Sequence, residues 1–432
     1  MVFLDPPRAG PLLGRTRAFL RGSREGRSSA LAALRAFAGP TFIASVAYLD
    51  PGNFATNIAA GATHGYRLLW VVLLANLTAM LFQALSAKLG IVSGRSLARI
   101  CREQLPLPLT CILWAVSEIG AMATDLAELL GAAIGCALLL GTSLLAGTVL
   151  AGMLSWVILR LHQRSFRAVE AIIAGLILVV GLCFLVETAL IPPDWRAVIT
   201  HSFVPSFGGA GGVMLAAGIV GATVMPHALF LHSSVARDRL PAGDPSVLRR
   251  LVRASNIDIG LTLSVVGLVN MAMMYLAAVT FSAAGPAHPA SIESAYHLLG
   301  PLFGDAAAAI FIVSLLASGL SSSVVGTMAG QVIMQDFLDW QIPLWVRRLA
   351  TMLPTVVIAA FVTDATKALV ISQVVLSFVL PVPLITLVLF TGSRSVMGRL
   401  ANSPALGALA IAATAIVLGL NALLLASMLA PG

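Results

Sequence analysis

Charged residues are scarce in this chain. Of its 432 residues only 10% are Asp, Glu, Lys or Arg, whereas 59% are hydrophobic, and the mean hydropathy is +0.97. A soluble globular domain carries about 25% charged residues. The composition therefore excludes an ordinary soluble domain and indicates an integral membrane protein.

Other expected features are also missing. The four cysteines lie scattered, without the close pairs of a zinc site or a disulfide framework, and we expect them to be small packing residues; they are Cys101, Cys111, Cys136 and Cys183. The first 35 residues are rich in arginine and lack the short apolar core of a secretion signal. No His-Glu-x-x-His or Gly-x-Ser-x-Gly pattern occurs, which argues against an intramembrane hydrolase.

Long hydrophobic runs fill most of the sequence. Each is long enough for a membrane-spanning helix, which needs roughly 20 apolar residues. The eleven runs are 38–63, 68–91, 109–140, 143–161, 168–191, 210–236, 254–283, 304–335, 343–363, 367–391 and 406–429. The sequence thus predicts an all-α membrane protein with eleven helices and a basic arm at residues 1–37.

The positive charges predict the topology. With eleven helices and a cytoplasmic N-terminus, 23 of the 26 Lys and Arg fall in the N-terminal arm or in segments on the inner side. Only Arg67, Arg196 and Lys367 remain for the outside. This positive-inside bias predicts a multi-pass protein of the plasma (inner) membrane with its C-terminus outside. The net charge of +8 is therefore explained by topology and does not indicate a nucleic-acid surface.

The run 38–63 is interrupted at its centre by Asp50-Pro51-Gly52-Asn53. A carboxylate at the centre of a membrane helix costs about 2.5–3.5 kcal/mol, so it is rarely present without a function. Pro51 has no amide hydrogen and Gly52 tolerates almost any backbone geometry, so we expect a break in the helix. Irregular backbone of this kind survives inside a bilayer only where it lines a cavity.

A second break is predicted at Met225-Pro226-His227, in the centre of the run 210–236. Pro226 lies 175 residues after Pro51, a separation close to five helices. Paired broken helices at matching positions of two halves indicate a transporter site between inverted repeats. We therefore expect one repeat over residues 38–191 and an inverted one over 210–391, followed by an extra helix at 406–429.

Together the two breaks supply a mixed set of donors. Asp50 offers a carboxylate, Asn53 an amide oxygen and Met225 a thioether, and the prolines would free the backbone carbonyls of Ala222 and Ala47. Oxygen ligands alone would suit magnesium, calcium or sodium. A sulfur ligand favours manganese, iron, cobalt or cadmium over calcium. Asp50 would release a proton when the metal arrives, which would couple metal transport to protons.

The run 109–140 contains three acids, Glu118, Asp125 and Glu128. They would be costly toward lipid, so we expect them to face the bundle interior as structural partners of arginine or as a proton path. Arg347 and Arg348 are either anchors at the membrane surface or partners of these acids. His227 could also carry protons, and five positions separate it from His232, so the two rings face different sides of the helix. Glu187, Asp194 and Arg196 are expected to mark an outer loop.

These motifs resemble the Nramp (natural resistance-associated macrophage protein) family of proton-coupled divalent-metal transporters. The most specific segments are Asp50-Pro51-Gly52-Asn53 and Met225-Pro226-His227, with support from 122–128 (Met-Ala-Thr-Asp-Leu-Ala-Glu) and from Ala317-Ser318-Gly319. The resemblance implies a LeuT-like fold of two inverted five-helix repeats plus an eleventh helix. It implies transport of Mn²⁺ or Fe²⁺, also Co²⁺ and Cd²⁺, together with H⁺, and no enzymatic activity.

The resemblance also implies roles for individual residues. The metal ligands would be Asp50, Asn53, Met225 and the Ala222 carbonyl, joined in some conformations by the Ala47 carbonyl and Gln373. The proton route would include Asp50, Glu118, Asp125, Glu128, His227, His232, Arg347 and Arg348. The alternative is a sodium-coupled amino-acid transporter on the same fold, which Met225 and the three acids disfavour.

Overall fold

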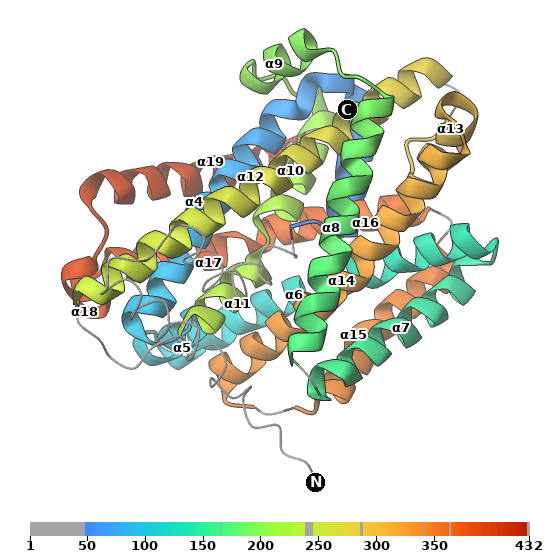
Figure 1. Ribbon diagram of the computed structural model, residues 1–432. Helices are drawn as coiled ribbons and strands as arrows, with labels where there is room; N and C mark the ends of the chain where they lie inside the picture. Colours follow the sequence, from blue (N-terminus) through green and yellow to red (C-terminus); the bar gives the residue numbers. More distant parts are fainter. Residues whose placement is uncertain are drawn as a thin grey trace, which may run out of the picture.

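A computed structural model of the chain describes residues 48–164, 166–237, 245–285, 288–340, 342–362 and 364–429. These residues form helices and short connections, and no strand occurs among them. Figure 1 shows the long helices packed into one bundle, with α7 and α15 together at one side and α9 at one end. The predicted all-α class is confirmed.

The helices before the second break are α3 (Pro51–His64), the 3-10 turn η1 (Gly65–Leu68), α4 (Leu69–Ser93), α5 (Leu97–Gln104), α6 (Leu107–Leu140), α7 (Leu144–Arg164), α8 (Phe166–Leu190), α9 (Trp195–Phe203) and α10 (Ala210–Val224). Those after it are α11 (Pro226–Arg237), α12 (Pro245–Ala284), α13 (Ile292–Phe303), α14 (Asp305–Leu338), α15 (Leu344–Phe361), α16 (Ala365–Val379), α17 (Pro381–Gly392), α18 (Arg394–Met397), η2 (Gly398–Leu400) and α19 (Pro404–Leu429).

Each of the eleven predicted runs contains a helix. By length and hydropathy, seven helical stretches of the described residues could cross a membrane, the first being α3, η1 and α4 together. Two shorter apolar segments, Leu144–Ile158 and Leu178–Leu190, lie in α7 and α8. Residues 1–47, and with them the predicted N-terminal arm and the first part of the run 38–63, lie outside the described residues.

The boundary of one helix was predicted wrongly. The hydrophobic run suggested a start at residue 254, but α12 begins at Pro245. Its first turns carry Arg249, Arg250 and Arg253, and charged residues lower the hydropathy without preventing a helix. A hydropathy signal therefore locates the membrane-embedded part and misses the polar turns that extend it.

Small residues bring the central helices close together. A Cβ atom on Gly131 of α6 would overlap the ring of Pro51 at the start of α3. A Cβ atom on Gly319 of α14 would lie 2.8 Å from the backbone nitrogen of Ala132. Close helix contact through small residues is typical of membrane bundles. Gly319 therefore serves close packing between α14 and α6, and Gly131 sets α6 directly behind the first break.

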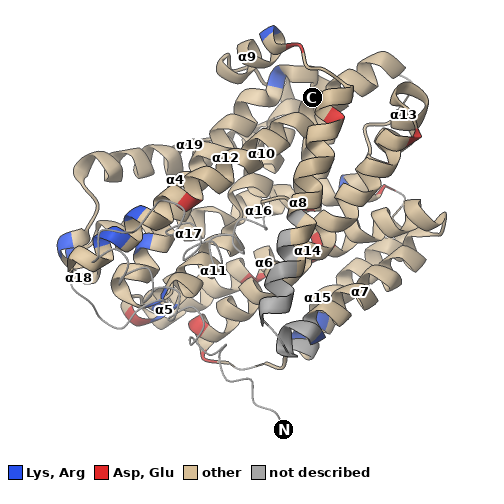
Figure 2. Cartoon of the chain, viewed as in Figure 1, with Lys and Arg blue, Asp and Glu red and all other residues tan. Residues whose placement is uncertain are grey.

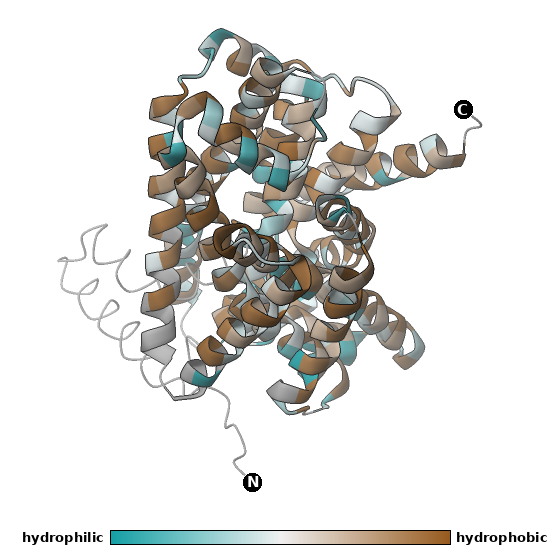
Figure 3. Ribbon diagram, turned by 90° about the vertical axis from the view of Figure 1, so that its right-hand side faces the viewer, coloured by the Kyte–Doolittle hydropathy of each residue, from teal (hydrophilic) through white to brown (hydrophobic). Residues whose placement is uncertain are grey.

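The outer faces of the bundle are apolar. Leu261, Val265 and Leu268, spaced along one face of α12, are 57%, 59% and 67% exposed. In Figure 3 much of the ribbon of the helices carries the brown colour of hydrophobic residues. Large exposed apolar surfaces of this kind are unfavourable in water but are what a bilayer covers. The chain is a multi-pass membrane protein.

Basic residues gather at one face of the bundle. Arg99 and Arg102 of α5 form ion pairs with Asp339, at the end of α14, over 2.7 and 2.8 Å. Arg237, at the end of α11, forms another with Asp336 over 3.0 Å. Figure 2 shows Lys and Arg grouped around α5 and α18. The structure thus brings together segments that the positive-inside rule assigned to the inner side.

Candidate metal-transport site

The first break is built around Asp50. This residue caps the N-terminus of α3, where its Oδ1 accepts hydrogen bonds from the backbone N–H and the side-chain amide of Asn53, at 2.9 and 2.8 Å. Pro51 takes the first helical position, where a missing amide hydrogen costs nothing. Asp50 is only 1% exposed, and its Oδ2 has no hydrogen-bond partner. A buried oxygen left unpaired in this way is suited to a cation.

The second break is a change of backbone direction at Met225. α10 ends at Val224, α11 begins at Pro226, and Met225 between them has φ +47° and is fully buried. A positive φ at a residue other than glycine costs of order 1–3 kcal/mol and is found mainly at functional sites. Because Pro226 has no amide hydrogen, the carbonyl of Ala222 lacks its usual helical donor.

The two breaks face each other. The side-chain amide of Asn53 donates to the Ala222 carbonyl over 3.3 Å, and the Thr223 hydroxyl donates to Asn53 Oδ1 over 3.2 Å. The Tyr48 hydroxyl donates to the carbonyl of Val224 over 3.4 Å. The predicted pairing of the broken segments is therefore present, with Asn53 at its centre.

A third helix, α16, adds an amide to this site. A Cβ atom on Gly52 would overlap the side-chain amide of Gln373, so the amide lies directly on the backbone of the first break. Gln373 Nε2 donates to Ser372 Oγ over 3.0 Å, and Gln373 Oε1 is buried without a partner. The structure thus places the Gln373 amide against Gly52 of the first break. Ala47, the remaining predicted ligand, lies outside the described residues.

The donors gathered here are few and varied. They comprise one carboxylate, two side-chain amides, one backbone carbonyl that lacks its helical donor and one thioether, from Asp50, Asn53, Gln373, Ala222 and Met225. Among the described residues no group of three or more His, Cys, Asp or Glu is placed to hold a metal. Tight structural zinc sites use Cys and His ligands. This mixed set instead suits a borderline divalent ion that must also be released.

The three acids of α6 face the interior. Arg347 Nη2 lies 2.8 Å from Glu118 Oε1, and Arg348 Nη1 lies 3.6 Å from Asp125 Oδ1. The two arginine side chains are only 4% and 2% exposed, which decides between the alternatives for them. They are partners of the acids, and the idea that they anchor α15 at the membrane surface is wrong.

Glu128 lies deeper and has no hydrogen-bond partner in the described structure. Both of its carboxylate oxygens are buried and unpaired, and a Cβ atom on Gly326 of α14 would collide with them. Glu128 lies three residues after Asp125, on the same face of α6, and Glu118 lies earlier on the same helix. The acids therefore form a series along α6, paired with arginine at one end and unpaired near Asp50.

The two histidines point to different helices, as their spacing predicted. His227 Nδ1 lies 3.0 Å from the Thr124 hydroxyl of α6, and its Nε2 has no partner. His232 Nδ1 contacts Gln83 Oε1 of α4, and Gln83 Nε2 in turn contacts the Tyr48 hydroxyl. Through Tyr48 this chain of hydrogen bonds reaches the second break at Val224.

Several residues of the site were not predicted. Tyr48 and Gln83 join His232 to the second break, and Thr124 joins His227 to α6. The Ser318 hydroxyl donates to the Leu49 carbonyl over 2.7 Å. Gln83 could have been noticed, since it is an amide inside an apolar run, as Gln373 is. Hydroxyl residues give no such signal because they commonly bond to their own helix.

One acid was placed wrongly. Glu187 was expected in an outer loop with Asp194, but it lies inside α8 and is only 2% exposed, with its Oε1 unpaired. Asp194 does lie in the connection, where its side chain caps α9. The predicted run 168–191 already reached past this acid, and α8 continues to Leu190, so Glu187 lies in the last turn of the helix.

The fold and this site define a class. The chain is a helical membrane protein of LeuT-like architecture in which two helix breaks face each other. Its structure matches a nucleobase-cation-symport-1 family transporter (Mhp1) in a closed conformation with TM-score 0.60 at 13% identity, over 91% of this chain and 93% of that one. It also matches the transporter MhsT with TM-score 0.58 at 15% identity, over 89% and 98%. At these identities the likeness is one of fold alone.

The family follows from closer matches. Residues 41–427 match the family model "Natural resistance-associated macrophage protein-like" (Nramp), and the chain belongs to this family. The divalent metal cation transporter MntH of Acidiphilium cryptum is 53% identical over 391 residues, 90% of each chain. That of Granulibacter bethesdensis is 51% identical over 97% of this chain and 95% of its own.

A solved structure agrees with these relatives. A mutant of the manganese transporter of Eremococcus coleocola superposes with TM-score 0.82 at 34% identity, covering 92% of this chain and 87% of that one. The resemblance drawn from the sequence motifs is thereby confirmed. Because these relatives are named as transporters, the expectation that the chain is not an enzyme is also supported.

Proposed function

We propose that this protein imports divalent transition-metal ions, Mn²⁺ and also Fe²⁺, together with protons, by alternating access around the two helix breaks. One observation supports this most directly. The unpaired, buried Asp50 Oδ2 lies beside Asn53, which is itself bonded to the Ala222 carbonyl across the breaks. The MntH relatives and the manganese transporter of Eremococcus coleocola carry names that agree with such a cargo.

The ion would bind between the breaks. Asp50, Asn53, Met225 and the Ala222 carbonyl would be its ligands, and Gln373 and the Ala47 carbonyl would join in other conformations. The Met225 sulfur would favour Mn²⁺, Fe²⁺, Co²⁺ and Cd²⁺ over the hard ion Ca²⁺. A single carboxylate leaves a positive charge on the loaded site, which is costly at low dielectric and suits an exchangeable cargo.

Protons would follow the polar residues around the site. Asp50 would lose its proton to the incoming metal. Glu128 and His227, each with unpaired atoms, lie nearest to the breaks, and the ion pairs made by Glu118 and Asp125 continue the series along α6. Arg347 and Arg348 would position the carboxylates of Glu118 and Asp125 along this route, and His232 would position Gln83.

The repeats and the orientation in the membrane belong to the same proposal. Residues 38–191 and 210–391 would form two inverted repeats that rock about the site, and 406–429 would be an added helix. The protein would lie in the plasma (inner) membrane with its N-terminus in the cytoplasm and its C-terminus outside. Its partners would be the metal ion, protons and the lipid bilayer, with no nucleic acid.

The proposal is tested with purified protein in liposomes that hold a pH-sensitive dye. Addition of Mn²⁺ outside should cause metal uptake and internal acidification together, and Fe²⁺, Co²⁺ and Cd²⁺ should compete. Amino acids with sodium should not compete. Uptake of manganese without acidification would contradict proton coupling. Uptake of an amino acid in place of metal would contradict the proposed cargo.

A further inference from the structure

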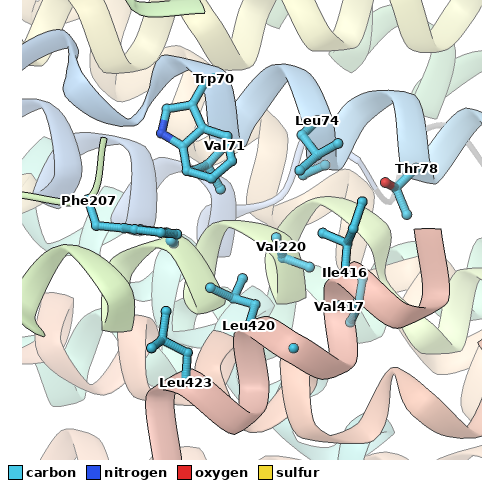
Figure 4. Close-up of a pocket in the computed structure, with 13 residues that line it drawn as sticks. Trp70, Val71, Leu74, Thr78, Phe207, Val220, Ile416, Val417, Leu420 and Leu423 are labelled. Carbon is cyan, nitrogen blue, oxygen red and sulfur yellow. The ribbon is translucent and has the colours of Figure 1, made fainter. Parts of the chain in front are cut away.

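An apolar cavity lies away from the transport site, between α4, α10 and α19. Its volume is about 140 Å³. Figure 4 shows side chains of these three helices, with Phe207 from the preceding connection, converging on it. The lining residues are Trp70, Val71, Leu74, Ala75, Thr78, Phe207, Ala216, Val220, Ile416, Val417, Gly419, Leu420 and Leu423.

Water is a poor occupant of this space. A buried water needs 2–4 polar partners, and apolar cavities of about 150 Å³ stay dry and take up apolar molecules. Thr78 supplies the single hydroxyl group of the lining, and the Trp70 indole N–H is already bonded to the carbonyl of Ser206 over 3.0 Å. The apolar lining is therefore suited to a hydrocarbon group.

The cavity extends from the lipid side of the bundle to its interior. At its edge, Ile416 and Leu423 of α19 are 50% and 44% exposed. Its floor is formed by fully packed residues such as Val71 and Ala216. α19 is the least buried of the candidate membrane spans, so bilayer lipid surrounds the opening.

A positive charge lies at one end of the cavity. Arg67 is exposed three residues before Trp70, and a Cβ atom on Gly208 would lie 3.5 Å from its guanidinium. Gly208 directly follows Phe207, which lines the cavity, so Arg67 stands beside this wall. A guanidinium at the membrane surface attracts a phosphate group.

Gly419 shapes the space. It lines the cavity, and a Cβ atom added to it meets no atom within 4 Å. A larger residue there would therefore fill the cavity without a backbone clash. Gly407, on the same helix, also has open space around it but does not line the cavity, and it provides a matched control.

We propose that this cavity binds a segment of one acyl chain of a bilayer phospholipid whose phosphate group lies at Arg67. The chain enters between Ile416 and Leu423, covers the apolar floor and fills the gap between α19 and α10. The site is separate from the metal site, and the proposal does not depend on the cargo.

A photoactivatable phospholipid tests the proposal. The parent protein is placed in nanodiscs that contain a phospholipid with a diazirine in its acyl chain, illuminated and digested, and the adducts are mapped by mass spectrometry. Adducts are expected on the buried residues Val71, Ala216 and Val220. In Gly419→Leu these should fall by about tenfold, the factor that loss of roughly two buried methylenes gives, while adducts on the exposed Leu409 stay constant.

Two controls keep the test decisive. Gly407→Leu should leave the adducts on the buried residues unchanged, and Gly419→Ala should give an intermediate loss if the leucine variant folds poorly. Equal labelling of the buried residues in the parent and both Gly419 variants, or labelling of exposed residues only, would overturn the acyl-chain site.

The phosphate contact has its own test. Arg67→Gln should lower the adducts of the phospholipid but not those of a diazirine hydrocarbon without a headgroup. Equal labelling in Arg67→Gln would overturn the phosphate contact.

Discussion

The side-chain amide of Asn53 donates a hydrogen bond to the carbonyl of Ala222 over 3.3 Å, so two residues that are 169 positions apart in the chain join the two helix breaks. Each group is available for a local reason. Asn53 lies in the first turn of α3, where Asp50 caps the helix, and Ala222 lies four residues before Pro226. Two interruptions of helix hydrogen bonding thus bring oxygen donors together, with the buried Met225 at the second break.

The Met225 thioether should control selectivity. In Met225→Ala we expect manganese uptake to fall several-fold and discrimination against calcium to fall further, because calcium gains nothing from a sulfur ligand. The measurement is competition of Ca²⁺ with Mn²⁺ uptake in liposomes. Met214→Ala, on the same half-helix and 37% exposed, is the matched control. Equal losses for the two ions would contradict a selective role of the sulfur.

Gly52 should be intolerant of any side chain. A Cβ atom there would overlap the amide of Gln373, so Gly52→Ala must push Gln373 away or shift the first break. We expect metal uptake to fall by at least about tenfold, the cost of a ligand displaced at roughly 1–2 kcal/mol, with normal expression and folding. Uptake by Gly407→Ala should remain unchanged. Normal uptake by Gly52→Ala would show that the contact with Gln373 is dispensable.

The ion pair of Glu118 with Arg347 should contribute to stability. Breaking a buried pair costs about 3–5 kcal/mol, and somewhat less is expected here because the Glu118 side chain is 16% exposed. Glu118→Gln should therefore lower the thermal unfolding temperature in detergent. The double variant Glu118→Gln with Arg347→Met should recover part of the loss, since no unpaired charge is left. A double variant less stable than the sum of the single ones would argue against direct pairing.

Glu128 should serve proton movement more than metal binding. Its two carboxylate oxygens are buried and unpaired, so Glu128→Gln keeps the shape and removes only the capacity to exchange a proton. We expect the variant to bind Mn²⁺ normally and to acidify liposomes much less for each ion imported. The measurement is the ratio of dye signal to metal uptake. An unchanged ratio would place the proton route elsewhere.

Much of the proposed site could be predicted because it contains charged and helix-breaking residues inside apolar helices. Asp50 and the two prolines are unfavourable in apolar helices, and the acids of α6 are costly in a membrane. Such conflicts are visible without a structure. The same reasoning correctly separated the directions of His227 and His232 from their spacing alone.

The partners of these residues could not be predicted in the same way. Whether Arg347 reaches Glu118 or the membrane surface depends on the depth and rotation of α15, which side-chain packing sets. Tyr48, Thr124 and Ser318 are compatible with apolar helices, so their role appears only when a neighbouring helix brings an acceptor close. The short helices α5, α9 and α13 were missed because hydropathy detects only long apolar segments.

The central claim is that the two breaks hold the metal through Asp50, and direct binding tests it most simply. Mn²⁺ binding to the purified protein is measured by calorimetry for the parent, for Asp50→Asn and for Asp194→Asn, whose carboxylate caps α9 outside the site. The account predicts one saturable site in the parent and in Asp194→Asn, and none in Asp50→Asn. Undiminished binding by Asp50→Asn would contradict it and would place the metal elsewhere.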